Sequence, residues 1–264
     1  IFLSKISNLF ANYVVKLLIG MYAGPSAVSY FSVPQKLLGA FGGILSNAAS
    51  TLMPYVSTLK SEGRRGAIDN ILVRTSFIFS AVTIPIALTI SIYSKEILQL
   101  WLNESFAREA WLVLTLTCIS ATIGSFTTIP NQVVLGLGNS RLLGHFSILT
   151  VIAYLVFLPV LTKYYLLDGA AYGLLAASLL LVLYVIQKST KTLGVSTLYY
   201  LKIVFLPHLF PLVMFLIINC LIVSFLEVMD LQKLFIGIMM AGLYYLFLWV
   251  NNKKEILEAL NNNC

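Results

Sequence analysis

The chain has 264 residues, of which 59% are hydrophobic and only 10% are charged, and its mean hydropathy is +0.92. A soluble domain carries about 25% charged residues, so this composition excludes a disordered chain, a secreted disulfide scaffold and an ordinary cytosolic enzyme, and predicts an integral membrane protein. The net charge of +7 would indicate nucleic-acid binding in a soluble protein, but membrane proteins concentrate lysine and arginine in cytoplasmic loops, so we expect no nucleic-acid partner.

Eight apolar segments are each long enough for a helix that crosses a bilayer, which takes about 20 residues. They span residues 3–22, 31–58, 71–93, 110–135, 145–165, 168–187, 203–226 and 232–250. Because lipid offers the backbone no hydrogen-bond partners, such segments must be helical. The sequence therefore predicts an all-α polytopic membrane protein with eight transmembrane helices.

The connection between the fifth and sixth segments is very short. Only Leu166 and Leu167 separate them, and Asp168 and Gly169 follow. This spacing predicts a tight helical hairpin.

A basic stretch rich in serine and threonine, residues 188–202, follows the sixth segment. This change in composition predicts a boundary near residue 190. We expect a six-helix bundle in 1–190, and two additional transmembrane helices with a cytoplasmic tail in 191–264. Residues 251–264 have the pattern of a short amphipathic helix. The sequence opens on Ile1, inside an apolar segment without a signal-peptide pattern, so we expect an N-terminal part of a longer chain to precede it.

The basic residues are divided unequally between the two sets of connections. The richer side carries Lys5, Lys60, Arg64, Arg65, Arg74, Arg141, Lys188, Lys191, Lys202, Lys253 and Lys254, and the other side carries Lys95, Arg108, Lys163 and Lys233. Lysine and arginine accumulate on the cytoplasmic side of membrane proteins. An even number of crossings brings both ends to one side, so we expect both ends of this chain in the cytoplasm.

The first two predicted helices carry polar stripes. The first stripe consists of Lys5, Asn8, Asn12 and Lys16. The second consists of Ser32, Gln35/Lys36, Gly39, Gly43, Ser46/Asn47, Ser50 and Pro54. Within each stripe, successive positions are three or four residues apart. Such spacing gathers side chains on one face of a helix. A stripe that ends in lysine is costly against lipid, so the first stripe is expected to face protein or a water-filled cavity. For the glycines and serines of the second stripe, close helix packing is the favoured interpretation, whereas Lys36 and Asn47 favour a cavity wall.

Lys16 and Lys36 have two interpretations. Each lies near the outer end of its predicted helix, where a lysine stem can extend to the headgroups. Alternatively, both form a cationic lining for an anionic substrate, because each lies on the polar stripe of its helix and a short loop joins the two helices. Arg74 lies about one turn from the cytoplasmic end, where extension to the headgroups is the favoured interpretation.

The fourth predicted helix has a third polar stripe. It comprises Thr117, Ser120/Ala121, Gly124/Ser125, Thr128 and Asn131/Gln132, and Pro130 interrupts it. Proline frees a backbone carbonyl and allows a bend. Transporters use bent helices at binding sites and hinges, although proline is also common in membrane helices generally.

Several kinds of chemistry find no support in the sequence. No predicted helix interior contains Asp or Glu, which argues against a carboxylate proton relay. His145 and His208 fall near predicted helix ends, where we expect them at the membrane interface. Cys118, Cys220 and Cys264 have neither disulfide nor metal-ligand spacing, and no phosphate-binding, zinc-protease or hydrolase motif occurs. We therefore predict no metal, no cofactor and no enzymatic activity.

Four stretches carry a family resemblance. Residues 16–59 contain a helix, a turn with Gly24 and Tyr30, and a long helix of small residues that ends at Pro54. SKEILQLWL, VLGLGNSRLL and DGAAYGLLAASLL follow at 94–102, 134–143 and 168–180. In order and spacing these stretches resemble the C-terminal half of the polysaccharide flippases, the O-antigen and capsule-unit transporters of the multidrug/oligosaccharidyl-lipid/polysaccharide exporter superfamily.

This resemblance implies two six-helix bundles around a central cavity, of which this chain holds the second. It implies that the protein flips undecaprenyl-pyrophosphate-linked oligosaccharide across the bacterial inner membrane by alternating access. Lys16 and Lys36 would bind the pyrophosphate, while Asn12, Asn47, Asn131 and Gln132 would bind sugar hydroxyls. The implied partners are the lipid-linked oligosaccharide, membrane lipids, the N-terminal bundle of the same chain and other polysaccharide assembly proteins.

One departure and several alternatives accompany the resemblance. Many relatives have an acidic residue where this chain has Val15, so ion coupling through a local acid–base pair is not expected. A drug or cation antiporter would show buried carboxylates. A lipid II flippase is closer, because it also has two additional helices and a cationic cavity. A membrane enzyme such as an O-antigen polymerase, and a purely structural subunit, are the rivals from other classes.

Overall fold

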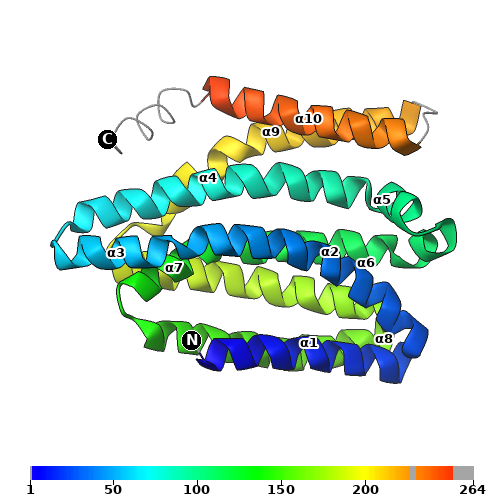
Figure 1. Cartoon of the computed structure of the whole chain (residues 1–264), viewed down its shortest axis with the longest axis horizontal. Coiled ribbons are helices and arrows are strands. Elements are labelled where there is room, and N and C mark those ends of the chain that lie inside the picture. Colours follow the sequence, from blue (N-terminus) through cyan, green and yellow to red (C-terminus); the bar gives the residue numbers. More distant parts are fainter. Residues whose placement is uncertain (1, 226–229, 252–264) are drawn as a thin grey trace.

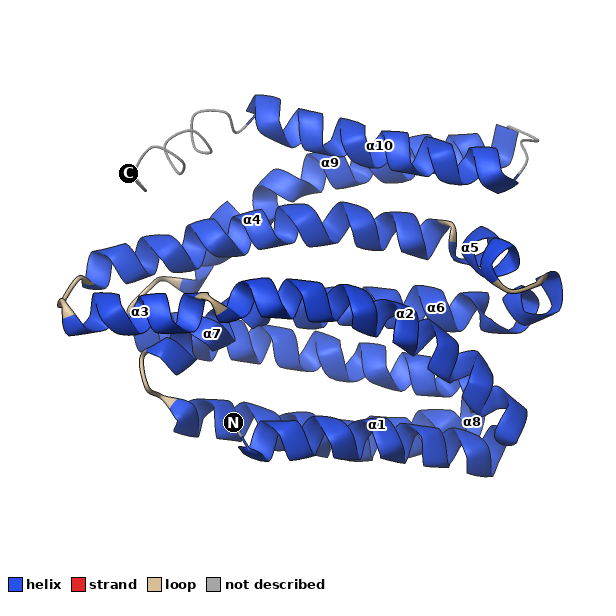
Figure 2. Cartoon of the chain, in the orientation of Figure 1, coloured by secondary structure: helices blue, strands red, loops and turns tan. Residues whose placement is uncertain are grey.

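The computed structural model describes residues 2–225 and 230–251, which are helical apart from short turns (Figures 1 and 2). The helices are α1 (Phe2–Ala23), α2 (Pro25–Ser50), α3 (Leu52–Ser61), α4 (Arg65–Ile92), α5 (Ser94–Trp101), α6 (Glu104–Ser125), α7 (Thr128–Gly136), α8 (Ser140–Leu193), α9 (Thr197–Phe225) and α10 (Asp230–Asn251). Four described stretches, 65–92, 104–136, 140–193 and 197–219, are long and apolar enough to cross a membrane. The chain is therefore an all-α, multi-pass membrane protein, as the composition predicted. The predicted tail helix at 251–264 lies outside the described residues, apart from Asn251.

The helices run side by side along the long axis of the molecule (Figure 1). α1 packs on α8, α6 packs on α2, α4 and α8, and α9 and α10 pack on each other and on α4. Successive connections alternate between the two ends. The α3–α4 turn and the α7–α8 loop lie at the left of Figure 1, whereas α5 lies at the right. This alternation agrees with the predicted order of crossings; the cytoplasmic location of the basic end stays a prediction.

Two of the predicted segments are each broken into two helices. α2 gives way to α3 at Thr51, and α6 gives way to α7 at Phe126 and Thr127. Proline has no N–H for the carbonyl four residues earlier, and its ring clashes with that carbonyl. Pro54 and Pro130 therefore account for the positions of the two breaks, and the prediction that Pro130 interrupts its helix is confirmed.

The two short helices beyond these breaks pack closely on each other. A Cβ atom on Gly136 of α7 would lie 2.7 Å from the carbonyl oxygen of Met53 in α3. The Lys60 Nζ at the end of α3 donates to the carbonyl oxygen of Leu137, at a distance of 2.6 Å. This bond satisfies one of the carbonyls left without an intrahelical partner at the end of α7.

The predicted hairpin is confirmed within α8. Leu166, with φ 53° and ψ −125°, reverses the chain between two helical arms. A Cβ atom on Gly169 would overlap the carbonyl oxygen of Leu161, and one on Gly173 would lie 2.9 Å from Leu158 Cδ2. Glycine at these positions lets the two arms approach closely.

His208 corrects one expectation. The structure begins α9 at Thr197, earlier than predicted, so His208 lies inside the helix and only 2% of its surface is exposed. It contacts α4 and α10 and is not at an interface with headgroups. His145, by contrast, is exposed near the start of α8. The division of the chain near residue 190 stays a prediction.

Candidate functional site

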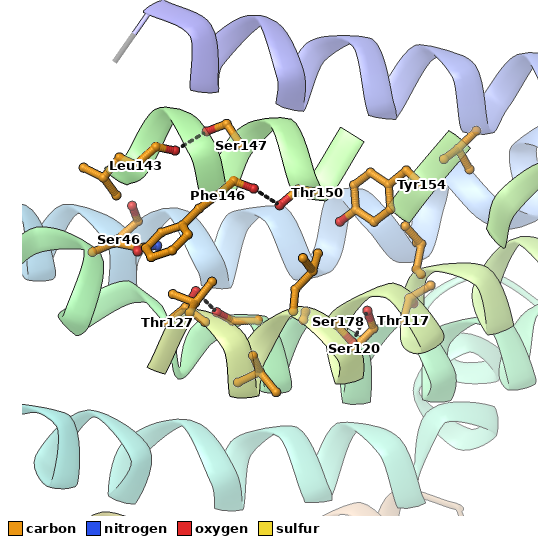
Figure 3. Close-up of a pocket in the computed structure, with 18 of the residues that line it drawn as sticks. Ser46, Thr117, Ser120, Thr127, Leu143, Phe146, Ser147, Thr150, Tyr154 and Ser178 are labelled. Carbon is orange, nitrogen blue, oxygen red and sulfur yellow. Dashed lines mark hydrogen bonds between the residues drawn. The ribbon is translucent and has the colours of Figure 1, made fainter. Parts of the chain in front are cut away.

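A cavity of about 730 Å³ lies between α1, α2, α6, α7 and both arms of α8 (Figure 3). Its volume is in the range of small-molecule binding sites, about 300–1,000 Å³. Its wall combines serine, threonine, asparagine and glutamine side chains with aromatic and aliphatic ones. No charged side chain is among the described residues that line it.

The polar stripe predicted on the fourth helix supplies one wall of the cavity. α6 contributes Thr117, Ser120, Ala121 and Gly124 to this wall, Thr127 lies at the break, and α7 contributes Asn131 and Gln132. The first four residues recur at three- and four-residue spacing, which places them on one face of α6. The break between α6 and α7 places the start of α7 in the same wall of the cavity as α6.

The two arms of α8 also line the cavity, which was not predicted; Ser178 of the second arm accepts from Ser120 of α6 at 3.3 Å. The first arm contributes Leu143, Phe146, Ser147, Thr150 and Tyr154 to the cavity wall. The second arm contributes Leu174, Ser178, Leu181, Val182 and Val185. Figure 3 shows Thr150 and Tyr154 directed towards the space between the arms and α6. The signal was the helical spacing of these sparse hydroxyls, but the long apolar runs around them obscured it.

α1 and α2 contribute less than the sequence indicated. Val15 lines the cavity from α1, and Phe31, Gln35 and Ser46 line it from α2. In the pairs Gln35/Lys36 and Ser46/Asn47, the first residue of each pair is therefore the one in the wall. Neighbouring helical residues point about 100° apart, so a step of one residue is enough to leave the cavity.

The remaining predicted site residues lie outside this wall. Lys36 and Asn47 are exposed and Lys16 is partly buried, and none of them lines the cavity among the described residues. The side chain of Asn12 lies outside the described residues. Of the predicted set, the cavity brings Asn131 and Gln132 together. Substrate binding by any of these residues stays a prediction.

The close packing considered for the glycines of α2 does not occur within the described chain. Cβ atoms on Gly39 and Gly43 would meet no described atom within 4 Å. These glycines share the exposed side of α2 with Lys36 and Asn47.

Most hydroxyls in the cavity wall donate to their own helix. Thr117 Oγ1 donates to the Val113 carbonyl at 2.6 Å, and Thr150 Oγ1 donates to the Phe146 carbonyl at 2.9 Å. Ser147 and Ser178 also donate to carbonyls of their own helix, at 3.0 and 2.8 Å. Asn131 Oδ1 is buried without a hydrogen-bond partner among the described residues.

The cavity therefore presents neutral hydrogen-bonding groups. Within the described residues, no group of three or more His, Cys, Asp or Glu side chains is placed to hold a metal ion. The mixture of amides, hydroxyl oxygens and apolar side chains suits the binding of a polar, uncharged molecule.

Comparison with known proteins agrees with this arrangement. Residues 1–110 match the family of polysaccharide biosynthesis proteins. A Shigella flexneri protein described as an O-antigen transporter is 22% identical over 161 residues, which cover 60% of this chain and 37% of the relative. The lipid II flippase MurJ, in an inward closed conformation, has the same fold: the TM-score is 0.76 at 16% identity, over 96% of this chain and 52% of that one. The chain thus spans about half or less of the proteins that it matches. Together these findings agree with the resemblance drawn from the sequence: residues 1–110 match a family of polysaccharide biosynthesis proteins, and the fold is that of a lipid II flippase.

Proposed function

We propose that the protein carrying this chain flips an undecaprenyl-pyrophosphate-linked oligosaccharide, an O-antigen or capsule repeat unit, across the bacterial inner membrane. The observation that carries the proposal is the uncharged polar cavity inside a bundle of apolar helices. A sugar headgroup loses its hydrogen bonds to water when it enters hydrocarbon, and that loss is costly. A polar cavity at this depth offers replacement bonds, while the apolar outside of the bundle meets lipid.

The proposal assigns roles to residues from both faces of the helices. Asn131 and Gln132 bind sugar hydroxyls from within the cavity. Lys16 and Lys36 bind the pyrophosphate, and Asn12 and Asn47 bind sugar, from the side where an N-terminal bundle of the same chain packs. Rocking of the two bundles then opens the site to one leaflet at a time. Both ends of this chain are cytoplasmic, and the protein acts as a transporter and not as an enzyme.

A lipid II flippase is the second candidate. It is favoured by the likeness to MurJ, which extends over 96% of this chain. Because the identity is 16%, that likeness concerns the fold. The two candidates differ in the sugar and peptide that the same kind of lipid carrier bears.

Genetic complementation tests the proposal. The complete natural reading frame is expressed in one bacterial strain that lacks its O-antigen transporter and in another that is depleted of its lipid II flippase. We expect surface polysaccharide to return in the first strain, measured by immunoblotting of whole-cell lipopolysaccharide, and growth not to return in the second. Rescue of the second strain alone would favour the lipid II candidate. Rescue of neither, with the tagged protein present in the membrane fraction, would contradict both.

A further inference from the structure

We infer that this cavity binds the uncharged sugar part of the substrate through hydrogen-bond donors on the sugar, and that the pyrophosphate is held outside the cavity. The inference rests on the proposed function and deepens it by naming the chemical class that the cavity accepts. That class comprises neutral sugars with hydroxyl and N-acetyl groups. Acidic sugars fall outside it.

The described cavity wall has no charged side chain, so it can hold the neutral sugar but not the charged pyrophosphate. A pyrophosphate carries at least two negative charges in a small volume, and a buried charge needs an opposite charge or several donors. The described wall offers no lysine, arginine or histidine. Gln35 and Ser46 line the cavity where the charged Lys36 does not. A neutral headgroup has no such requirement.

The direction of the hydrogen bonds made by the hydroxyls of the cavity wall further restricts the ligands that the cavity can bind. A serine or threonine hydroxyl has one proton to donate and two lone pairs to accept with. The protons of Thr117, Thr150, Ser147 and Ser178 are committed to backbone carbonyls. These oxygens are therefore left as acceptors, and Ser178 Oγ already accepts from Ser120 Oγ at 3.3 Å. Sugar hydroxyls and amide N–H groups can donate to these oxygens, whereas phosphate and carboxylate oxygens cannot. The wall also has donors in the amide N–H groups of Gln35, Asn131 and Gln132, but these groups are neutral and do not offset the charge of an anion.

Asn131 provides an independent observation of the same kind. Its Oδ1 atom is buried in the structure and has no partner among the described residues. An unpaired buried acceptor is costly, and a bound donor removes that cost. Asn131 lines the cavity from α7, and Thr150 lines the same cavity from the first arm of α8.

The experiment measures binding of three probes to the protein expressed from its complete reading frame and purified in detergent. The probes are a short polyprenyl diphosphate, the same lipid bearing an N-acetylhexosamine disaccharide, and the same lipid bearing a disaccharide that ends in a uronic acid. Isothermal titration calorimetry gives each dissociation constant. We expect the neutral disaccharide to strengthen binding about tenfold over the bare lipid, which corresponds to one or two hydrogen bonds, and the uronic acid to remove most of that gain.

Two variants locate the effect. Asn131→Leu and Thr150→Val are expected to abolish the gain from the neutral disaccharide and to leave the affinity for the bare lipid unchanged. Thr192→Val is the matched control, because Thr192 is on the same helix and makes the same kind of bond, to the Lys188 carbonyl at 2.8 Å, but is exposed outside the cavity. Thr150→Ser, which keeps the hydroxyl, should restore the gain and excludes a general folding defect.

Each other outcome is decisive. The inference is overturned if either variant weakens binding of the bare lipid as strongly as binding of the glycosylated lipid, because the cavity would then hold the diphosphate. Equal affinity for the neutral and the acidic disaccharide would also overturn it. Failure of the wild-type protein to bind any of the three probes would instead refute the proposed function, and the inference with it.

Discussion

His208 is buried between the membrane helices, with a hydrogen bond at each ring nitrogen. Ser80 Oγ donates to the Phe77 carbonyl at 2.8 Å, so its free lone pair accepts from His208 Nε2, also at 2.8 Å. His208 Nδ1 then accepts from the Tyr244 hydroxyl at 2.9 Å. A neutral imidazole has one donor and one acceptor, so both neighbours are satisfied by a single tautomer. The two bonds of the imidazole join α9 to α4 and to α10.

Replacement of His208 by leucine should destabilise the protein. The change leaves the buried Tyr244 hydroxyl without its partner, at a cost of about 1–3 kcal/mol. We expect a lower midpoint of thermal unfolding in detergent, followed by intrinsic fluorescence. His145→Leu is the matched control, since His145 is exposed on α8, and its midpoint should stay close to that of the wild type.

A second variant separates the hydrogen bond from the packing. His208→Leu combined with Tyr244→Phe removes both partners, and removal of both is much less costly than removal of one. The double variant should therefore regain part of the lost stability. A double variant less stable than His208→Leu alone would show that the ring contacts, and not the hydrogen bonds, hold these helices together.

At the level of elements, close approach at glycine fixes the relative positions of neighbouring helices. Gly169 brings the second arm of α8 against the Leu161 carbonyl, and Gly136 brings α7 against Met53 of α3. Both contacts are with backbone, which cannot move aside as a flexible side chain can. The cavity walls on α7 and α8 depend on these two contacts for their positions.

Gly169→Ala should disrupt the hairpin of α8. The added methyl group would overlap the Leu161 carbonyl oxygen, and overpacking of this kind costs at least about 1–3 kcal/mol. We expect a lower yield of monodisperse protein in size-exclusion chromatography and a lower unfolding midpoint. Gly39→Ala is the control, because its methyl group would meet no described atom within 4 Å. Equal behaviour of the two variants would mean that the arms are not in close contact in solution.

The whole molecule has two kinds of surface in the membrane region. Thr150 and Ser178 face the polar cavity, whereas Leu155 and Leu183, on the same two arms of α8, are 47% and 62% exposed on the outside of the bundle. Water can fill a polar cavity of this size. The apolar outside is expected to meet lipid tails, which exclude charged reagents.

Cysteine labelling distinguishes the two surfaces. Cys118, Cys220 and Cys264 are first replaced, and single cysteines are then introduced at 150, 178, 155 and 183 in the complete protein. A charged thiol reagent applied to membranes should label positions 150 and 178 and leave positions 155 and 183 unlabelled, because thiolate reaction needs water.

Cysteines at 12, 16, 36 and 47 extend the same measurement to the predicted lysine and asparagine sites. Labelling at all four would support an aqueous path along α1 and α2. Labelling at 16 and 36 alone would mean that the lysines extend to the outer interface, and the assignment of pyrophosphate binding to them would fail. Labelling at 155 and 183 as strongly as at 150 would contradict the division of surfaces.

The sequence by itself determined the features that depend on local chemistry. Lipid leaves an apolar segment no alternative to the helix, so the all-α fold followed from composition. Pro130 removes one donor at a known position, so the break between α6 and α7 was predictable. The connection at Leu166–Gly169 is too short for anything but a tight hairpin.

Only the tertiary structure decided which side of each helix faces the cavity. Residues spaced by three and four share a face, but that spacing does not distinguish Gln35 from Lys36 or Ser46 from Asn47, whose directions depend on how α2 packs on α6. The spacing of the α8 hydroxyls is visible in the sequence, but the cavity that they face is not, and neither are the partners of His208. In both cases the neighbours come from helices distant in the chain. Spacing along one helix records no information about its rotation against another, and packing of the whole bundle sets that rotation.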